Sequence, residues 1–257
     1  MNLAGKIALV TGASRGIGRA VAIGLAREGC GVACAARATD AAPLRLPGTI
    51  DETVRAIEAA GGVGLAVPTN LSVEEEVVAM VRTTAEHFGR LDVLVNNAAI
   101  TFLGDLDIPQ KRHDLVMAVN YRAPYLAMRE AVPELRERGE GSILNLSSIA
   151  AVRVIPSLMT YGVSKAALER LTVDAGEQLK SFGIAVNCFR IDVPVASEGF
   201  LANAPEADHS DWEPSEVPAE GVVWMLKQPP SFTGNVVSMS WLRETEGIMA
   251  SRIRASG

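Results

Sequence analysis

Ile-Ala-Leu-Val-Thr-Gly-Ala-Ser-Arg-Gly-Ile-Gly, residues 7 to 18, is an apolar run that leads directly into a glycine-rich turn. The segment from Arg19 to Glu28 has the composition of a helix and follows the turn without a break. Such a turn between a buried strand and a helix presents bare backbone N–H groups and the positive helix end to a pyrophosphate. A tight structural turn is the alternative, and the strand-turn-helix order favours the phosphate site. The predicted contact residues are Gly12, Ser14, Arg15, Gly16, Ile17 and Gly18.

Farther along the chain, short apolar runs alternate with amphipathic stretches of helical period. This alternation is typical of a parallel sheet with helices on both faces. The runs are almost wholly apolar, as in Val93-Leu94-Val95, which excludes a half-exposed antiparallel sheet. We expect an α/β fold with a single doubly wound, Rossmann-type parallel sheet of about seven strands. The expected strands are residues 6–11, 31–36, 63–67, 92–95, 141–147, 184–189 and 235–239.

The composition is that of a packed and acidic protein. Its 257 residues are 48% hydrophobic and 21% charged, and the formal net charge is -6. This charge argues against binding to nucleic acid or to an anionic membrane, because both require a basic protein face. Cys30, Cys34 and Cys188 lie in apolar runs and do not suggest a disulfide framework. No linker-like stretch divides the chain, so we expect one domain, residues 1–257. The apolar run after Lys6 is too short for a signal peptide or a membrane span, so we expect the cytoplasm.

Three further patterns bear on the function. The glycines of the turn are spaced Gly-x-x-x-Gly-x-Gly, Asn96-Asn97-Ala98-Ala99 follows the fourth expected strand, and Tyr161 precedes Lys165 by four residues. Together they resemble the short-chain dehydrogenase/reductase family, from about residue 3 to residue 189. The resemblance implies an oxidoreductase that binds a nicotinamide dinucleotide and forms a homo-oligomer, a dimer or a tetramer. It also implies that three residues line the adenine ribose: Asn97, Ala98 and Ala99.

The end of the second expected strand bears on the choice of cofactor. An acid there would bind the ribose hydroxyl of NAD, whereas this chain has Ala36 and then Arg37. A carboxylate would repel a 2′-phosphate, while Arg37 and Arg15 can pair with it, so we expect NADP(H). Either arginine could also be an ordinary surface charge. Asn70-Leu71 resembles the family's Asp-hydrophobe pair at the adenine ring, and Asn70 can still accept a hydrogen bond there.

Tyr161 and Lys165 carry the expected chemistry. Reduction of a carbonyl needs a hydride donor and an acid that protonates the forming alkoxide. A phenol can be that acid if a nearby positive charge lowers its pKa. Residues four apart share one face of a helix, so the ammonium of Lys165 is placed to act on Tyr161. By itself this spacing is that of a common exposed pair, and the resemblance adds that Lys165 holds the nicotinamide ribose.

Ser148 and Asn120 complete the expected catalytic set. Ser148 follows the fifth expected strand, at the edge where open α/β sheets bind ligands, and matches the family's substrate-orienting serine better than Ser147 does. Asn120 matches a helix asparagine that links Lys165 to solvent through a water. Pro124 supports this role, because it lacks the N–H that would bond the carbonyl of Asn120. A plain proline kink is the alternative.

The family pattern fails after the sixth expected strand. Ile191 and Asp192 stand where the family has Pro-Gly, and Ser197 is only a shifted candidate for the Thr that follows. The segment 192–218 contains seven acids and no Lys or Arg, and we expect it to be a lid. Its charge favours a neutral ketone, aldehyde or alcohol over an anionic acyl thioester. Five apolar residues are expected at the substrate: Ile149, Val152, Ile155, Met159 and Phe200.

Three hypotheses for the function remain. The first is an NADP(H)-dependent carbonyl reductase or alcohol dehydrogenase that acts on a small molecule. The second is a reductase of 3-oxoacyl thioesters, and the third is a catalytically weak NADP(H)-binding sensor or scaffold, which the missing Pro-Gly keeps open. The set of Asn, Ser, Tyr and Lys favours an enzyme. His87, His113 and His209 are scattered, so no metal site is expected.

Overall fold

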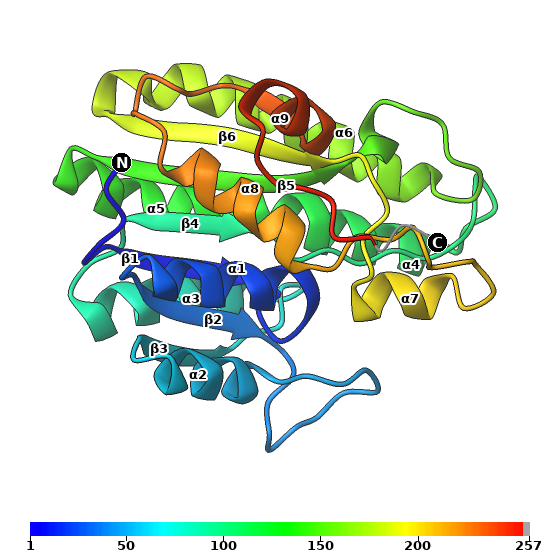
Figure 1. Cartoon of the computed structure of the whole chain (residues 1–257), viewed down its shortest axis with the longest axis horizontal. Helices are drawn as coiled ribbons and strands as arrows, with labels where there is room; N and C mark the ends of the chain where they lie inside the picture. The colour runs from blue at the N-terminus through cyan, green and yellow to red at the C-terminus, as the bar shows by residue number, and fades with distance from the viewer. Residues whose placement is uncertain (254–257) are drawn as a thin grey trace.

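The structure is a computed structural model, and it describes residues 1–253. Its centre is one sheet of seven parallel strands in the order β3-β2-β1-β4-β5-β6-β7 (Figure 1). This sheet confirms the expected fold class. The strands are β1 (Ile7–Thr11), β2 (Gly31–Ala36), β3 (Val63–Pro68), β4 (Val93–Asn96), β5 (Gly141–Ser148), β6 (Ile184–Ile191) and β7 (Val236–Ser238).

Helices join the strands and cover both faces of the sheet. The α-helices are α1 (Gly16–Arg27), α2 (Ile50–Ala59), α3 (Glu74–Phe88), α4 (Gln110–Met117), α5 (Ala123–Arg138), α6 (Met159–Leu179), α7 (Glu198–Asn203), α8 (Glu216–Leu226) and α9 (Met239–Glu246). Shorter helical segments are η1 (Ala118–Arg122), η2 (Ile149–Ala151) and η3 (Lys180–Phe182). α1, α2 and α8 pack on the face turned toward the viewer in Figure 1, and α3, α5 and α6 pack on the other.

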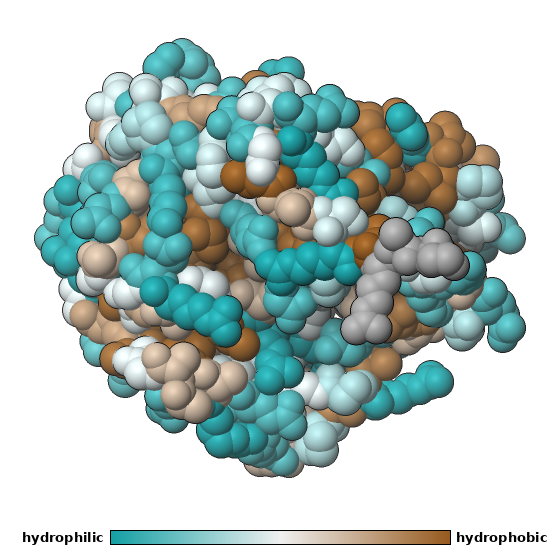
Figure 2. Space-filling model, viewed as in Figure 1, coloured by the Kyte–Doolittle hydropathy of each residue, from teal (hydrophilic) through white to brown (hydrophobic). Residues whose placement is uncertain are grey.

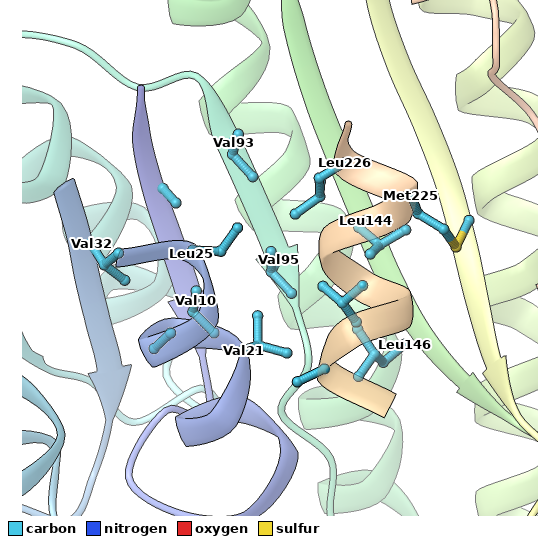
Figure 3. Close-up of a cluster of buried hydrophobic side chains, with 14 of the residues drawn as sticks. Val10, Val21, Leu25, Val32, Val93, Val95, Leu144, Leu146, Met225 and Leu226 are labelled. Carbon is cyan, nitrogen blue, oxygen red and sulfur yellow. The ribbon is translucent and has the colours of Figure 1, made fainter. Parts of the chain in front are cut away.

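An apolar layer on each side of the sheet holds the helices in place. In the layer shown in Figure 3, side chains from β1, β4 and β5 meet those of α1 and α8. Val10 and Val95 are fully buried there, and Leu146 is 4% exposed. Burial of one such side chain contributes roughly 1.5–3 kcal/mol. Because both faces are covered, the strands can be almost wholly apolar, as the sequence predicted.

The outer surface over these helices is mixed in character. Figure 2 shows hydrophilic and hydrophobic residues interspersed on the face that carries α1, α2 and α8. Among the described residues, no helix is long and apolar enough to cross a membrane.

β1 lies where the order of the strands in the sheet reverses: β2 and β3 are added on one side of it, and β4 to β7 on the other. It pairs with β2 on one side and with β4 on the other, because the chain returns from the edge strand β3 to the middle of the sheet. In open α/β sheets, ligands bind in the crevice outside the carboxyl ends of the strands at such a switch point. The glycine-rich turn follows β1 at this place.

The observed strands differ most from the expected ones at β6. The sequence predicted that this strand ends at residue 189, but it continues to Ile191. Ser147 and Ser148 of β5 pair with Arg190 and Ile191, so the two strands end together. Proline at position 191 would remove a backbone donor, and its absence lets the ladder continue.

The segment 192–218, the expected lid, is a loop with its two ends held together. A parallel bridge joins Val195 to Glu213, with backbone hydrogen bonds from Ala196 to Glu213 and from Glu213 to Pro194. The loop contains α7, and its aromatic rings pack on one another, with Phe200 and Trp212 stacked at 4.6 Å.

Glu213 also anchors the segment that follows α9. Its side chain is 1% exposed and accepts hydrogen bonds from Arg243 Nη2 at 2.5 Å and from the backbone N–H of Arg252 at 3.0 Å. The base of the lid is therefore attached both to β6 and to the end of the described chain.

Candidate functional site

The glycine-rich turn leaves no room for side chains at its glycines. Gly12 and Gly16 have φ angles of +68° and +55°, which favour glycine. A Cβ on Gly18 would lie 2.3 Å from the carbonyl oxygen of Gly12, and one on Gly12 would lie 2.8 Å from Asn97 Nδ2. The backbone of this turn is therefore bare and tightly packed against β4.

The start of α1 fits the phosphates of a dinucleotide. Arg15 occupies the N-cap position, but its side chain makes no capping hydrogen bond, and no acidic residue lies in the first turn. The first N–H groups of a helix lack partners within the helix, and they carry a partial positive charge. Glycine at positions 16 and 18 places no side chain in front of these N–H groups. Ser14 and Ile17 lie in the same turn and are buried and half-buried, respectively.

Thr11 and Asn97 fasten the turn to the end of β4. Thr11 Oγ1 donates to the carbonyl of Val95 and accepts the N–H groups of Asn97 and Ala98, at 3.0 and 3.1 Å. Asn97 Nδ2 donates to the carbonyl of Thr11 at 2.8 Å. Asn97 thus has the partners of a polar residue at a strand end, and it holds the predicted ribose segment beside the turn. Ala99 is exposed next to it.

At the expected adenosine end, the two arginines have different surroundings. Arg37 is exposed, whereas Arg15 Nη2 donates to the carbonyls of Leu46 and Gly48, both at 3.0 Å. Burial lowers the pKa of Arg15; Glu198 raises it, and the nearby charge of Arg37 lowers it further. Arg15 therefore fastens the loop after β2 to the glycine-rich turn, with its charge close to that of Arg37.

Asn70 and Leu71 follow β3 at the same edge of the sheet. Asn70 Oδ1 accepts hydrogen bonds from the backbone N–H of Ser72 at 3.2 Å and from Ser72 Oγ at 2.8 Å. The oxygen expected to meet the adenine ring thus already stabilises a local turn. Leu71 is half-buried and packs against the apolar layer of α3 and α5.

Ser148, Tyr161 and Lys165 come together at the carboxyl end of β5. Tyr161 and Lys165 lie one turn apart near the start of α6, and Ser148 is the last residue of the strand. Lys165 Nζ is 5.7 Å from the centre of the Tyr161 ring and donates to the carbonyl of Leu146 at 2.7 Å. The Ser148 side chain also accepts from the backbone N–H of Ala150.

The pKa values of this group differ from the expectation. Burial raises the pKa of Tyr161, and a hydrogen bond with Ser148 lowers it only in part. Burial also lowers the pKa of Lys165 to about 8, against the opposing effects of Cys188 and Glu169. The expected lowering of the Tyr161 pKa by Lys165 is therefore not seen in the chain alone, where loss of hydration of the tyrosinate outweighs the effect of Ser148.

Asn120 lies in η1, a π-helical turn between α4 and α5. The backbone N–H of Ala123 bonds the carbonyl of Ala118, five residues back, and Pro124 follows without an N–H. Single π-helical turns of this kind often occur at functional sites. The Asn120 side chain accepts the N–H of Ile100 at 2.9 Å and donates to Ser164 Oγ at 3.1 Å. It therefore connects the loop after β4 to the helix of Tyr161 and Lys165.

The residues after β6 take positions that the sequence did not predict. Asp192 Oδ1 accepts the backbone N–H of Ser240 at 3.0 Å, so this carboxylate is engaged at the start of α9. Ser197 caps α7, and its Cβ lies 3.0 Å from the point where a Cβ would stand on Gly16. Glu198 Oε2 lies 3.4 Å from the same point, is buried, and has no hydrogen-bond partner among the described residues. The lid thus begins directly on the glycine-rich turn.

The residues expected to line an apolar pocket lie around the same edge with varied exposure. Val152 is 55% exposed, Phe200 42% and Met159 37%, while Ile149 and Ile155 are half-buried. Exposed apolar side chains next to Ser148 and the lid are in keeping with an apolar substrate surface.

Sequence reasoning missed an ion pair beside the catalytic set. Glu169 binds Arg190 through two hydrogen bonds and also accepts from Ser147 Oγ. One signal was present in the sequence, since Glu169 follows Lys165 by one helical turn. The partner, Arg190, lies on a strand that is brought close only by the sheet.

Among residues 1–253, no cluster of His, Cys, Asp and Glu could hold a metal ion. The three cysteines are free and buried.

Comparisons with known proteins match the sequence and the fold over most of the chain. The model of the short chain dehydrogenase family matches residues 6–193. Hydroxysteroid dehydrogenase-like protein 2 of Bos taurus is 34% identical over 251 residues, a match that covers 96% of this chain and 59% of that protein. The chain thus spans less than two thirds of the length of this relative.

Solved structures with the same fold include complexes with either nicotinamide dinucleotide. A variant of a Serratia marcescens short-chain dehydrogenase/reductase is 31% identical, has a TM-score of 0.82, and the match covers 93% of this chain and 97% of that one. A metagenomic short-chain oxidoreductase in complex with NADP is 29% identical, with a TM-score of 0.77 and coverage of 93% and 99%. A short chain dehydrogenase from Mycobacterium paratuberculosis bound to NAD is 24% identical, with a TM-score of 0.81 and coverage of 94% and 98%, and shows the fold alone.

Proposed function

The chain belongs to the short-chain dehydrogenase/reductase family, and from this premise we propose that it is an NADP(H)-dependent oxidoreductase that interconverts a ketone or aldehyde and an alcohol. One observation carries the proposal: Ser148 ends β5 beside the start of α6, where Tyr161 and Lys165 lie one helical turn apart, at the sheet edge that also bears the glycine-rich turn. These are the groups that a proton transfer to an alkoxide requires.

Each residue of the site has its own role in the proposed reaction. Gly12, Gly16 and Gly18 would receive the phosphates of the dinucleotide, whose nicotinamide ring would exchange a hydride with the carbonyl carbon. Ser148 orients the carbonyl oxygen, and Tyr161 donates the proton to that oxygen during reduction or accepts it during oxidation. Because burial raises the pKa of Tyr161, the phenol of the chain alone stays protonated and ready to donate.

Lys165 and Asn120 support the tyrosine. The ammonium of Lys165 would hold the nicotinamide ribose and stabilise the tyrosinate left after proton transfer. Asn120 connects the loop after β4 to Ser164, next to Lys165, and its position in a π-helical turn supports a path for the proton toward solvent. The proposed path of the proton leads from the substrate oxygen to Tyr161 and on by way of Lys165 to a water at Asn120; Lys165 would also hold the ribose of the cofactor.

The preference for NADP(H) over NAD(H) rests on charge. Arg37 is exposed after β2, its charge lies near that of Arg15, and no acid stands at position 36 or 37. Two arginines near the adenosine end favour a 2′-phosphate. Asn70, Leu71 and the segment Asn97–Ala99 would meet the adenosine.

The proposed substrate is a neutral carbonyl or alcohol with an apolar body. The exposed apolar groups of Val152, Met159 and Phe200 support an apolar skeleton, and the acidic lid disfavours an anionic substrate. The name of the Bos taurus relative refers to a hydroxysteroid, which is an alcohol on an apolar skeleton.

Two alternatives have less support. A reductase of 3-oxoacyl thioesters would have to admit an anionic carrier past the acids of the lid. A catalytically weak NADP(H)-binding sensor is favoured by the loss of Pro-Gly, because Asp192 points its carboxylate at α9 instead of shaping a nicotinamide pocket.

We further propose a homo-oligomer, a dimer or a tetramer, in the cytoplasm. Tyr125 on α5 and Val163 and Val173 on α6 are large apolar residues that are 40–54% exposed on one side of the molecule, where a second copy would cover them. The free, buried cysteines are in keeping with a reducing compartment.

The test measures the oxidation of NADPH and of NADH by their absorbance, with panels of ketones, aldehydes and acyl thioesters as substrates. The matched control is Tyr161→Phe, which removes only the hydroxyl. We expect turnover with NADPH and ketones or aldehydes that falls by at least about a hundredfold in the variant, while NADPH binding is retained. Tight NADPH binding without turnover that depends on Tyr161 would favour the sensor instead.

A further inference from the structure

A buried ion pair lies behind Tyr161 and Lys165, and the proposed mechanism gives it no role. Glu169 accepts hydrogen bonds from Arg190 Nε at 2.8 Å and Nη2 at 2.7 Å, and from Ser147 Oγ at 2.7 Å. The side chains of Arg190 and Glu169 are only 21% and 11% exposed. Fork-shaped pairs of this kind are stronger and better defined in geometry than exposed pairs.

Three elements that form the catalytic edge meet at this pair. Ser147 lies opposite Arg190 in the register of β5 and β6, so both side chains leave the sheet on the same face. Glu169 extends from α6 toward them, one turn beyond Lys165. The pair therefore ties α6 to the ends of both strands, beside Ser148 on β5.

Few charged or titratable groups surround the pair of Glu169 and Arg190. The thiol of Cys188 lies among them, with Glu169, Lys165 and Arg190 all acting on it. Lys165 itself makes its hydrogen bond to the carbonyl of Leu146 on β5. Glu169 of α6 and Cys188 of β6 act on Lys165, and the ring of Tyr161 lies 5.7 Å from its Nζ. Arg190 of β6 meets this group through its ion pair with Glu169 and its effect on Cys188.

We propose that Glu169 and Arg190 are positioning residues for Lys165: the pair holds the lysine helix at the sheet edge and balances the charge that the ammonium meets. The proposal rests on the proposed function, in which Lys165 acts beside Tyr161. A pair with a purely structural role would hold the helix in the same way but would not tune the lysine.

The electrostatic role makes the two members act in opposite directions. Burial lowers the pKa of Lys165 to about 8, and Glu169 opposes that fall. Removal of the carboxylate charge therefore lowers the pKa of Lys165 further, so that the amine loses its proton at a lower pH. Removal of the guanidinium charge leaves Glu169 less compensated and raises the pKa of Lys165.

The test is a pH titration of Lys165 in the full chain without cofactor. It is monitored by NMR of lysine labelled with ¹³C at Cε. The sequence has only five lysines, Lys6, Lys111, Lys165, Lys180 and Lys227, so each signal can be assigned by substitution. The variants are Glu169→Gln, Arg190→Gln and Arg190→Lys. The last variant keeps the positive charge and loses the fork-shaped geometry.

We expect the midpoint of Lys165 to fall by about one pH unit in Glu169→Gln and to rise by about as much in Arg190→Gln. Arg190→Lys should stay close to the unsubstituted chain. Shifts in the same direction for both Gln variants, unchanged midpoints, or an equal shift in Arg190→Lys would overturn the proposal. If Glu169→Gln does not fold, the Lys165 midpoints of Arg190→Gln and Arg190→Lys still test the proposal, because only the first variant removes the positive charge.

The pH profile of kcat/KM separates this proposal from the proposed function. Its alkaline limb should move to lower pH in Glu169→Gln and to higher pH in Arg190→Gln, in step with the NMR midpoints. If the midpoints shift as expected but no variant or parent turns over a carbonyl with NADPH, the proposed function fails and the charge balance at Lys165 remains. If turnover depends on Tyr161 but the midpoints do not shift, the positioning proposal alone fails.

Discussion

Glu198 brings a carboxylate to the turn that fits a pyrophosphate. Its Oε2 is buried 3.4 Å from the point where a Cβ would stand on Gly16, without a hydrogen-bond partner among the described residues. An unpaired buried charge is unfavourable, and here the charge of Arg15 interacts with that of Glu198. If the dinucleotide phosphates bind at this turn as proposed, the carboxylate of Glu198 would repel them and oppose their binding.

Substitution Glu198→Gln should therefore tighten the binding of NADPH. We expect the Kd to fall roughly five- to tenfold, because removal of a repulsion of about 1 kcal/mol at this partly buried place changes affinity by that factor. The measurement is a fluorescence titration with NADPH. Asp208→Asn, a change of the same kind at an exposed position of the lid, is the control and should leave the Kd unchanged; an unchanged or weaker Kd in Glu198→Gln would contradict the prediction.

Some residues of the site were predictable from the sequence, whereas some of its contacts were not. Tyr161, Lys165, Ser148 and the glycines were predicted from local motifs together with their resemblance to the short-chain dehydrogenase/reductase family. The pairing of Glu169 with Arg190 and the contact of Glu198 with Gly16 join residues 21 and 182 positions apart. Only the assembled sheet decides such contacts.

Among the elements, the lid has a single buried carboxylate, that of Glu213, at its base. Glu213 is held at its base by Arg243, by the N–H of Arg252 and by Ser251. Burial tends to raise the pKa of Glu213, but these hydrogen bonds outweigh it, and the net pKa is lowered. A lowered pKa in the folded state means that the carboxylate stabilises the fold at pH values above its unfolded pKa of about 4.5, and that this contribution is lost as the pH falls toward the folded pKa.

Substitution Glu213→Gln should lower the Tm at pH 7, and the difference from the parent should shrink toward pH 4. The reason is that the parent itself loses the carboxylate in acid. Thermal unfolding followed by circular dichroism at both pH values is the measurement. Glu206→Gln, at an exposed position of the lid, is the control. A difference in Tm that is as large at pH 4 as at pH 7 would show that the charge of Glu213 has no part in the stability.

The elements themselves were largely predictable. The seven expected strands are confirmed with small changes at their ends, since buried parallel strands have a distinctive apolar composition. The closure of the lid by Val195 and Glu213 was not predictable, because an isolated bridge has no periodic signal. The π-helical turn at Asn120 also has no periodic signal. The sequence predicted only that Pro124 leaves the carbonyl of Asn120 without its usual N–H partner.

In the whole molecule, the proposed cofactor would touch both halves of the sheet. Its phosphates would lie after β1, its adenosine after β2 and β3, and its ribose and nicotinamide near the ends of β4 and β5. A ligand that binds only the folded state stabilises it by about 2.7 kcal/mol at a concentration a hundredfold above its Kd.

Saturating NADPH should accordingly raise the Tm by roughly 5–10 °C in a protein of this size. NADH at the same concentration should raise it less, because it lacks the 2′-phosphate. Differential scanning fluorimetry measures both shifts. Arg37→Ala should reduce the shift with NADPH to that with NADH, and an equal shift for the two cofactors in the parent chain would argue against the preference for NADP(H).

The bridge between Val195 and Glu213 has a consequence for how new specificities can arise on this fold. It places the two ends of the intervening loop side by side, so a change in the length of the loop leaves β6 and α8 where they are. Doubling the length of a flexible loop with fixed ends costs only about 0.6 kcal/mol. We therefore expect that residues 199–212, which lie beyond the contact of Ser197 and Glu198 with the glycine-rich turn, can be exchanged as a cassette. A library of loops grafted there would sample substrates while the proton-transfer machinery stays constant.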